Sequence, residues 1–297
     1  MSDVKPDLPA KVDHLRQIIA ALGSAGVAYS GGVDSTLLLA MCREVLGAAR
    51  VLALTAQSEL VPAVELTQAA DMAKQLGVRQ RIVHFDTLSN PHISANRPDR
   101  CYHCKKALFT RLLEIAQAEG VATLVHGANL DDTGDYRPGM RAAEELGVRA
   151  PLLEAGFTKA DVRDLSRQMG LPTWDLPSMA CLASRIPYDI PLTIEALARV
   201  DAAESALREC FALRQLRVRD HFPLARLEVP EADIAHLLQP DARQKIVRRL
   251  QELGYRYVTL DLQGFRSGSM NETMNNAQMA NGESQVADSE WRMTNGG

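Results

Sequence analysis

The stretch Ala28–Leu39, AYSGGVDSTLLL, decides how the first half of the chain is expected to fold. It joins the end of a short apolar segment to a loop rich in glycine and serine, and then to an apolar run that predicts a helix. This order is typical of a phosphate-binding loop between a strand and a helix. The lysine that usually reaches the phosphates in such loops is absent, and Asp34 stands close to its expected position.

Strand-like and helix-like patterns alternate on both sides of this loop. We predict helices over 12–22, 34–46, 62–77, 105–118 and 158–169, and strands over 26–29, 51–56, 81–85 and 123–127. Thr158 and Asp161 are predicted to cap the last of these helices. Strands that alternate with helices predict an α/β fold, with a parallel sheet and helices on both faces. Ligands of such sheets bind at the carboxyl ends of the strands, where the loop lies.

The pattern changes after Pro191. An amphipathic helix is predicted from Thr193 to Cys210, followed by three strand-like runs, LRVRDH, LARLEV and YRYVTLDL, and a basic helix before the last of them. We therefore expect a first domain over 1–185 and a smaller α+β domain over 186–270. The polar tail, 271–297, is rich in Asn, Gln and Ser and is expected to be disordered.

The composition is that of a globular protein rather than of a membrane or nucleic-acid-binding protein. The 297 residues are 46% hydrophobic and 24% charged, and the net charge is −4. A chain that grips long nucleic acid is usually more basic. No run of 18 apolar residues predicts a membrane span, and the first residues lack the apolar core of a signal peptide. We expect a cytoplasmic protein whose five cysteines serve metal or redox chemistry more than disulfides.

The residue types of the loop predict a polyphosphate site. Glycines let backbone N–H groups approach an anion, hydroxyl groups add donors, and the following helix directs its positive end to the same place. The predicted ligands of ATP and its pyrophosphate are Ser30, Gly31, Gly32, Asp34, Ser35 and Thr36. Because the carboxylate of Asp34 would repel phosphate, a Mg²⁺ ion between them is implied. The competing interpretation is a simple Gly-Gly turn capped by serine.

The run RCYHCKKALF holds a C-x-x-C pair, Cys101 and Cys104, and Cys181 follows much later in SMACLASRIPY. Such a pair alone is half a zinc site, a redox pair or a coincidence. If the three thiolates meet at the ligand edge of the sheet, they leave one coordination position open. A [4Fe–4S] cluster held by three cysteines has that arrangement, and Zn²⁺ with three cysteines and a water is the less favoured alternative. Cys42 and Cys210 are expected to be packing residues.

The loop SGGVDST resembles the signature of the PP-loop ATP pyrophosphatases. That resemblance implies that the loop holds the leaving pyrophosphate while a substrate oxygen is adenylated at the α-phosphate. Further runs, HGANLDDTGDYRPG from His126, the segment from Gly156 to Tyr188 and YVTLDLQGFRSGSMNE from Tyr257, are similar to the LarE family over roughly residues 10–275. LarE proteins are ATP-dependent sulfur transferases of nickel-pincer cofactor synthesis.

The resemblance implies adenylation of pyridinium-3,5-biscarboxylate mononucleotide and its conversion to a thiocarboxylate. Some members give up the sulfur of one cysteine, whereas others hold a [4Fe–4S] cluster on three cysteines. Cys101, Cys104 and Cys181 place this sequence with the second group, as catalytic residues together with Asp34. The implied partners are the small nucleotide and sulfide or another sulfur donor, with no nucleic acid and no membrane, in a homo-oligomer.

The resemblance also assigns roles to single residues. Arg217 and Arg219 match substrate-phosphate ligands and share one face of a strand at period two. It further suggests Ser184, Arg185 and Lys105 as substrate or AMP contacts, Gly127 as an ATP contact, and Asp131 and Asp132 as helpers with Mg²⁺ or loop order. The resemblance also implies a second metal site. Its expected ligands are Glu204 and Glu228, which match acidic residues of the family, and His236, which replaces a third acidic residue. Residues 186–270 would thereby bind substrate phosphate and mediate oligomerisation.

Two other functions compete with sulfur transfer to a nucleotide. A tRNA-thiolating PP-loop enzyme combines the same loop with cysteines, but the negative net charge opposes RNA binding. The basic helix from Arg243 is the one candidate patch, and its apolar positions indicate an ordinary amphipathic helix. A nucleotide sensor without catalysis is disfavoured by the intact loop and the three cysteines.

Overall fold

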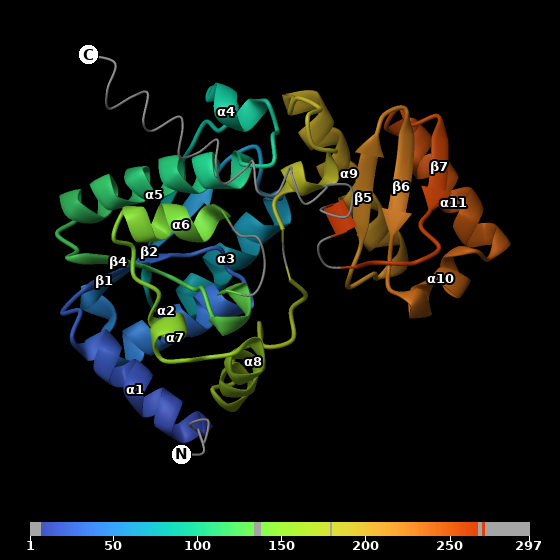
Figure 1. Ribbon diagram of the computed structural model, residues 1–297. Helices are drawn as coiled ribbons and strands as arrows, with labels where there is room; N and C mark the ends of the chain where they lie inside the picture. Colours follow the sequence, from blue (N-terminus) through green and yellow to red (C-terminus); the bar gives the residue numbers. More distant parts are fainter. Residues whose placement is uncertain (1–6, 134–137, 179, 267–268, 271–297) are drawn as a thin grey trace, which may run out of the picture. The chain divides into compact units, whose positions relative to one another are not determined.

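The computed structural model describes residues 7–133, 138–178, 180–266 and 269–270 (Figure 1). The tail that was expected to be disordered, 271–297, lies outside these residues. The chain forms two compact units: Met1–Phe85 with Cys101–Met179, and Asp86–Arg100 with Ala180–Gly297. This division differs from the expected boundary after residue 185, and it places the segment 86–100 in the second unit rather than the first.

The first unit contains a four-stranded parallel sheet, as predicted. Its strands are β1 (Ala25–Ala28), β2 (Val51–Gln57), β3 (Arg79–His84) and β4 (Thr123–His126), in the order β3-β2-β1-β4. The central strand β1 pairs with both β2 and β4, so Ala28 lies between Leu54 and His126 at the carboxyl edge. The loop that follows β1 therefore emerges beside the loop that follows β4.

Helices cover both faces of this sheet, as the alternating pattern predicts (Figure 1). One core joins α1 (Leu8–Ala20), α2 (Val33–Leu46), α3 (Ala63–Gln75) and α8 (Lys159–Gln168) to one face. The other core joins α5 (Arg100–Ala118) and α6 (Pro138–Glu145) to the opposite face. The shorter elements of this unit are η1 (Ala48–Arg50), η2 (Leu130–Thr133) and α7 (Pro151–Glu154).

Local sequence signals explain where two of these helices begin. Thr158 and Asp161 form a reciprocal capping box at the start of α8, which confirms the predicted cap. Helix α5 begins at Arg100 rather than at Lys105, so the prediction of its start was wrong. Cys101 and Cys104 consequently lie inside the first turns of the helix and not in the loop before it. No proline or glycine stands between Arg100 and Lys105 to stop the helix from extending backward.

The second unit has its own small sheet, as expected for an α+β domain. Strands β5 (Arg217–His221), β6 (Leu224–Glu228) and β7 (Tyr257–Leu260) lie in the order β5-β6-β7. The pair β5-β6 is antiparallel and the pair β6-β7 is parallel. A separate apolar core packs this sheet against helices α9 (Ile194–Phe211), α10 (Glu231–Leu237) and α11 (Pro240–Glu252). The remaining elements are α4 (Pro91–Ser94) and η3 (Leu182–Arg185).

The buried side chain of Asn96 ties the segment 86–100 to the rest of the second unit. Its amide nitrogen donates to the carbonyl oxygens of Ile186, Pro187 and Ile190 at 3.3, 2.8 and 3.0 Å. The backbone N–H of Leu192 donates to Ser94 at 2.8 Å. One buried amide that satisfies three carbonyls is a strong constraint, because each unpaired group would cost about 1–3 kcal/mol. This contact explains why the segment departs from the first unit.

Candidate active site

The loop after β1 is held by its own serine hydroxyls. The Oγ of Ser35 accepts from the backbone N–H of Ser30 at 3.3 Å and donates to the carbonyl of Gly32 at 3.2 Å. The Oγ atoms of Ser30 and Ser35 are 3.2 Å apart. Gly32 occupies the N-cap of α2, where no side chain caps the first N–H groups. The loop thus presents backbone donors at the positive end of a helix, which suits an anion.

Two glycines of this region leave no room for a side chain. Gly31 has φ of +80°, and a Cβ there would lie 2.9 Å from the Cβ of Ala69. A Cβ on Gly127, directly after β4, would lie 2.9 Å from the backbone nitrogen of Ser35 and 3.0 Å from the carbonyl carbon of Asp34. The backbone at Gly127, after β4, therefore lies directly against the backbone of the loop that follows β1.

The carboxylate of Asp34 is held by two residues that the sequence did not single out. Its Oδ1 accepts from the Nδ2 of Asn129 at 2.9 Å, and its Oδ2 forms an ion pair with the Nζ of Lys159. The side chains of Asp34 and Lys159 remain 25% and 31% exposed, so solvent and a ligand can reach both. Lys159, the first residue of α8, therefore places an ammonium group beside a loop that contains no lysine of its own.

Asp131 and Asp132 order the loop after β4. Asp132 Oδ2 accepts from the backbone N–H of Asn129 at 3.0 Å, and Asp131 Oδ2 accepts from the backbone N–H of Lys159 at 2.8 Å. The N–H of Leu130 also donates to the carbonyl of Phe157 at 2.8 Å. These bonds join the loop to the start of α8, and so support the suggested role in loop order.

Cys101 and Cys104 lie one turn apart on α5 and are both partly exposed. Residues three apart on a helix are neighbours on one face, so the two thiols share a face. Cys181 belongs to the second unit, where it precedes η3. Cys42 is buried inside α2 as a packing residue, and burial raises the pKa of its thiol to about 12.

Lys105 and His126 lie on the side of the sheet covered by α5. The Nζ of Lys105 is 5.3 Å from the centre of the Phe109 ring, and that ring is 5.5 Å from His126. Burial, and next the positive charge of Lys105, lower the pKa of His126 to about 4. His126 also lines a cavity of about 250 Å³ with residues of α6 and α7. The imidazole is therefore neutral at physiological pH.

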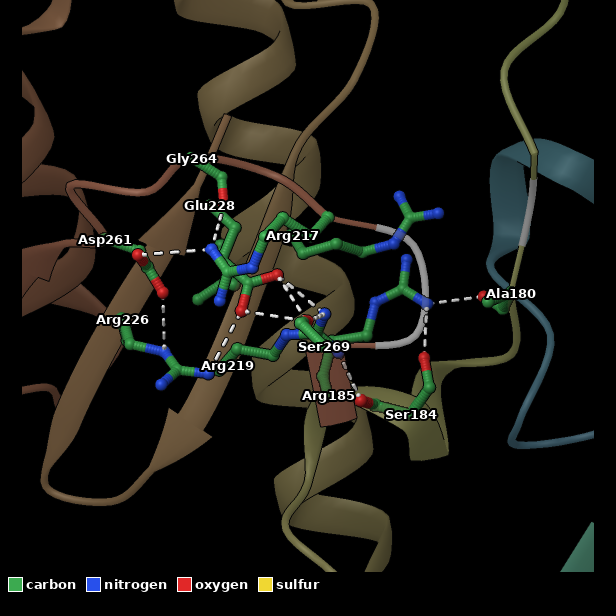
Figure 2. Close-up of polar contacts among 12 residues, drawn as sticks. Ala180, Ser184, Arg185, Arg217, Arg219, Arg226, Glu228, Asp261, Gly264 and Ser269 are labelled. Carbon is green, nitrogen blue, oxygen red and sulfur yellow. Dashed lines mark hydrogen bonds and ion pairs between the residues drawn. The ribbon is translucent and has the colours of Figure 1, made fainter. Parts of the chain in front are cut away.

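Arg217 and Arg219 lie on one face of β5, as the two-residue spacing predicts. Arg219 donates to the carbonyl of Ser184 at 2.6 Å, to Glu228 at 2.6 Å and to Ser269 at 2.8 Å (Figure 2). Burial, and then the nearby charge of Arg185, lower the pKa of Arg217 to about 10. The charge of Arg217 is therefore costly to keep in this buried place, and an anion beside it would reduce that cost.

Glu204 pairs with the guanidinium groups of two arginines. Its two oxygens pair with Nε and Nη2 of Arg185 at 2.8 and 2.9 Å, and Oε2 also pairs with Arg208 at 2.7 Å. Its Oε1 further accepts from the backbone N–H of Val218 at 3.1 Å. Burial alone would raise the pKa of Glu204, but the hydrogen bonds and charge of Arg185 lower it overall. The carboxylate therefore stays ionised and satisfied.

Glu228 likewise pairs with Arg219 and Arg226, at 2.6 and 3.0 Å. His236 lies on α10 with its ring 6.1 Å from that of Phe211. Across the part of the chain that the structure describes, no three His, Cys, Asp or Glu residues are arranged to hold a metal ion. Arginines pair with both carboxylates in the described residues, and the second metal site of Glu204, Glu228 and His236 stays a prediction.

Asn129 and Lys159 were missed because their contacts join distant parts of the chain. Each lies about a hundred residues from Asp34 in sequence, at separations of 95 and 125. The sequence offered one signal, the position of each residue: Lys159 directly follows the predicted cap Thr158, and Asn129 follows the predicted strand that ends beside the loop.

In the described ranges, no helix has the length and hydropathy needed to cross a membrane.

Comparison with known proteins places these features in a family. The NAD synthase family model matches residues 8–112, which include the loop. The pyridinium-3,5-bisthiocarboxylic acid mononucleotide synthase of Lactiplantibacillus plantarum is 45% identical over 254 residues, covering 86% of this chain and 91% of that protein. An uncharacterized protein of Synechocystis sp. is 42% identical over 267 residues, 90% of this chain and 99% of its own. One of Methanocaldococcus jannaschii is 28% identical over 241 residues, 81% and 90% of the two chains.

The match to the Lactiplantibacillus plantarum protein extends across both units and not only across the nucleotide loop. A match of this length includes the strand β5 with its two arginines wherever it begins. This extent confirms the resemblance found in the sequence: the chain belongs to the LarE family, the family of the pyridinium-3,5-bisthiocarboxylic acid mononucleotide synthases.

Proposed function

We propose that the protein is an ATP-dependent sulfur transferase that turns carboxylates of pyridinium-3,5-biscarboxylate mononucleotide into thiocarboxylates. The observation that carries this proposal is the 45% identity to the pyridinium-3,5-bisthiocarboxylic acid mononucleotide synthase. The PP-loop supports it, because its glycines and serine hydroxyls give the loop a fixed conformation that suits an anion. A substrate carboxylate oxygen attacks the α-phosphorus of ATP and pyrophosphate leaves. A sulfide then displaces AMP from the acyl carbon.

In this proposal the loop residues bind the pyrophosphate that is discarded. The backbone N–H groups at the start of α2 and the hydroxyls of Ser30 and Ser35 stabilise its charge. Mg²⁺ fits the carboxylate of Asp34, because this side chain is a partly exposed oxygen donor at the loop. When bound, the ion would neutralise charge between phosphate oxygens.

The phosphate of the nucleotide substrate would bind at Arg217 and Arg219. Two observations support this: the buried position of the Arg217 charge near Arg185, and the position of Arg219 against the carbonyl of Ser184. Arg185 adds a third guanidinium within hydrogen-bond distance of Ser184 Oγ, at 3.1 Å. Guanidinium groups suit phosphate because their N–H groups match its oxygens in a forked arrangement.

Cys101, Cys104 and Cys181 would hold a [4Fe–4S] cluster. The two thiols on α5 fit such a group, since they are soft donors on one helical face with access to solvent. A cluster held by three protein thiolates leaves one iron that can carry an added sulfide. Zn²⁺ at the same thiols is the alternative, and iron and sulfide analysis of protein purified without oxygen separates the two.

The products of ATP cleavage test the proposal. With Mg²⁺ and the biscarboxylate mononucleotide, AMP and pyrophosphate are expected, and ADP as the main product would contradict it. Asp34→Ala should reduce turnover strongly without unfolding the protein, because the residue is partly exposed. Activity equal to the parent protein would remove Asp34 from the mechanism. Salt-dependent binding of tRNA in place of the mononucleotide would point to the RNA-thiolating alternative.

A further inference from the structure

The backbone of Cys181 is fixed within the second unit. Its carbonyl oxygen accepts from the N–H of Ser184 at 3.0 Å, from the Oγ of Ser184 at 2.8 Å and from Nη1 of Arg185 at 3.0 Å. Arg185 is itself held by its two hydrogen bonds to the buried Glu204. These bonds leave Cys181 little backbone freedom, so its thiol group starts from a fixed point.

The chain that leads to Cys101 is tied to the same unit by the buried side chain of Asn96. We call the three hydrogen bonds of its amide the Asn96 clamp; they reach the carbonyl oxygens of Ile186, Pro187 and Ile190. The backbone N–H of Asp189 donates back to the carbonyl of Asn96 at 3.1 Å. The segment before Cys101 and the segment after Cys181 are therefore bonded to each other.

Arg100 is the last residue of the second unit before the chain enters the first unit. Its N–H donates to the carbonyl of Arg97 at 2.9 Å, so a tight turn joins it to Asn96. Cys101 is bonded directly to Arg100. The position at which the chain reaches Cys101 is thus set by contacts that lie inside the second unit.

The Asn96 clamp shortens the connection between Cys101 and Cys181. The two cysteines are 80 residues apart along the chain, whereas Cys101 is five residues from Asn96 and Cys181 is five residues from Ile186. The path through the clamp therefore contains about ten residues. For a flexible chain, an eightfold longer connection lowers the chance that its ends meet about twentyfold.

The clamp is built on an unfavourable backbone and side-chain arrangement. Asn96 has φ of +55°, in the left-handed region that most residues avoid, and its partner Asp189 has φ of +63°. The Oδ1 of Asn96 is buried and has no hydrogen-bond partner among the residues that the structure describes. A buried acceptor without a partner is unfavourable, and strained positions of this kind gather at functional sites.

We propose that Asn96 is a positioning residue of the sulfur-transfer centre, whose amide holds Cys101 within reach of Cys181 before any metal binds. Thiolates that are already close lose less freedom when they bind one metal centre, so the metal is held more tightly. Cys104 follows Cys101 by one turn of α5 and supplies the third thiol. This role rests on the proposed function, in which the three cysteines hold a cluster.

Chemical cross-linking of the metal-free protein tests the position of the thiols. In a background with Cys104→Ser and Cys210→Ser, a short dimaleimide should join Cys101 to Cys181, and peptide mass spectrometry identifies the product. Cys42 is buried and does not react while the protein is folded.

Asn96→Gly should slow this cross-link about tenfold, because the three amide bonds are lost while the backbone bonds of the segment remain. Glycine adopts the left-handed conformation without strain. Asn96→Asp has nearly the same shape but no N–H group to donate, and it should have the same effect. Asn90→Gly is the matched control in the same segment and should keep the parent rate, because the side chain of Asn90 only caps α4.

Iron retention in the protein with all five cysteines gives a second readout. Asn96→Gly should lose iron to a chelator about tenfold faster than the parent protein, since Cys181 no longer starts close to Cys101. Ile246→Ala lowers the stability of the second unit through a core that does not include Asn96. It should keep the parent rates of cross-linking and of iron loss, which separates positioning from stability.

Absence of a cross-link between Cys101 and Cys181 in the parent background would overturn the proposal. Parent rates of cross-linking or of iron loss in Asn96→Gly would also overturn it. The same changes in Ile246→Ala would trace the effect to stability and overturn it as well. A parent protein that forms the cross-link but binds no iron would contradict the cluster of the proposed function, while the cross-link would still support the role of Asn96.

Discussion

Arg185 and Glu204 form a two-point ion pair that is almost fully buried, with side chains 2% and 1% exposed. The pair lies where β5 meets α9, and the same carboxylate also binds Arg208 and the backbone N–H of Val218. A single acid thus fixes two arginines and the second residue of β5. It also holds Arg185 next to Ser184, where the substrate phosphate is proposed to bind.

Replacement of Glu204 by Gln should therefore destabilise the protein. Loss of one partner of a buried ion pair typically costs about 3–5 kcal/mol, because the other charge stays buried without compensation. Chemical denaturation measures this loss. Glu209→Gln, at an exposed position on the same helix, is the control and should change the free energy of unfolding by less than about 0.5 kcal/mol. Equal effects of the two changes would contradict the role of Glu204.

Gly127→Ala should weaken ATP binding while leaving the sheet folded. The added methyl would lie 2.9 Å from the backbone nitrogen of Ser35, which is too close, and must push the loop away from β4. We expect at least a tenfold loss in ATP affinity by calorimetry, with near-normal circular dichroism. Gly26→Ala on β1 is the control, because its methyl would meet side chains at 3.4 Å or more. ATP affinity like that of the parent protein would show that the close approach is not required.

His126 should make the protein less stable as the pH falls from about 6.5 to about 4. Its pKa is lowered to about 4 in the folded state, mainly by burial and then by Lys105. Between these values the unfolded chain binds a proton that the folded protein does not, so stability decreases with decreasing pH. The full shift corresponds to about 3 kcal/mol.

His126→Gln should remove most of this pH dependence in urea denaturation between pH 7 and pH 4. His84→Gln, at an exposed position on β3, should leave the dependence unchanged. A pH profile of His126→Gln that matches the parent protein would show that the imidazole does not resist protonation.

Arg217→Gln should raise the KM for the mononucleotide without changing ATP affinity. Loss of a hydrogen bond to a charged group costs about 1.5–3 kcal/mol, or roughly ten- to a hundredfold in affinity. Arg217 is the better test of the two arginines, because Arg219 also holds the buried Glu228. Arg248→Gln makes the same charge change at an exposed site on α11 and serves as control. Equal weakening of ATP and substrate binding would contradict the assignment.

The order of elements in both units could be predicted because it depends on local patterns. Apolar strands and amphipathic helices carry their own periodicity, and Thr158 with Asp161 marks a helix start in four residues. The loop SGGVDST also specifies its own geometry, since Gly31 and the serine hydroxyls act within six residues. These parts of the fold and the site required no knowledge of distant contacts.

The contacts between distant residues could not be predicted in the same way. The pairing of Asp34 with Lys159 depends on how β4 and α8 return to the loop. The resemblance suggested Glu204 and Glu228 as metal ligands, whereas in the structure each carboxylate pairs with an arginine on a neighbouring element. Nothing in the sequence around Asn96 indicates that its amide bonds the segment 86–100 to the second unit. A sequence shows which groups need partners, but the tertiary fold selects them.

The cysteines should act as one unit if they hold one cluster. Cys101 and Cys104 lie on one turn of α5, and Cys181 precedes η3 in the second unit. A cubane held by three thiolates is expected to fall apart when any one becomes serine. Cys101→Ser, Cys104→Ser and Cys181→Ser should each lose most of the iron, the brown colour and sulfur transfer together. Cys42→Ser and Cys210→Ser are the controls and should keep all three.

Adenylation should survive in all five variants, because the PP-loop contains no thiol. A sacrificial cysteine predicts a different result: Cys181 alone would be essential, and the protein would lose about the mass of H₂S in one turnover. Zinc predicts a colourless protein that contains metal but no acid-labile sulfide. Anaerobic metal analysis with intact mass before and after turnover separates these outcomes. A colourless, iron-free protein that turns over repeatedly would show that these cysteines hold no cluster, since sulfur transfer would then proceed without one.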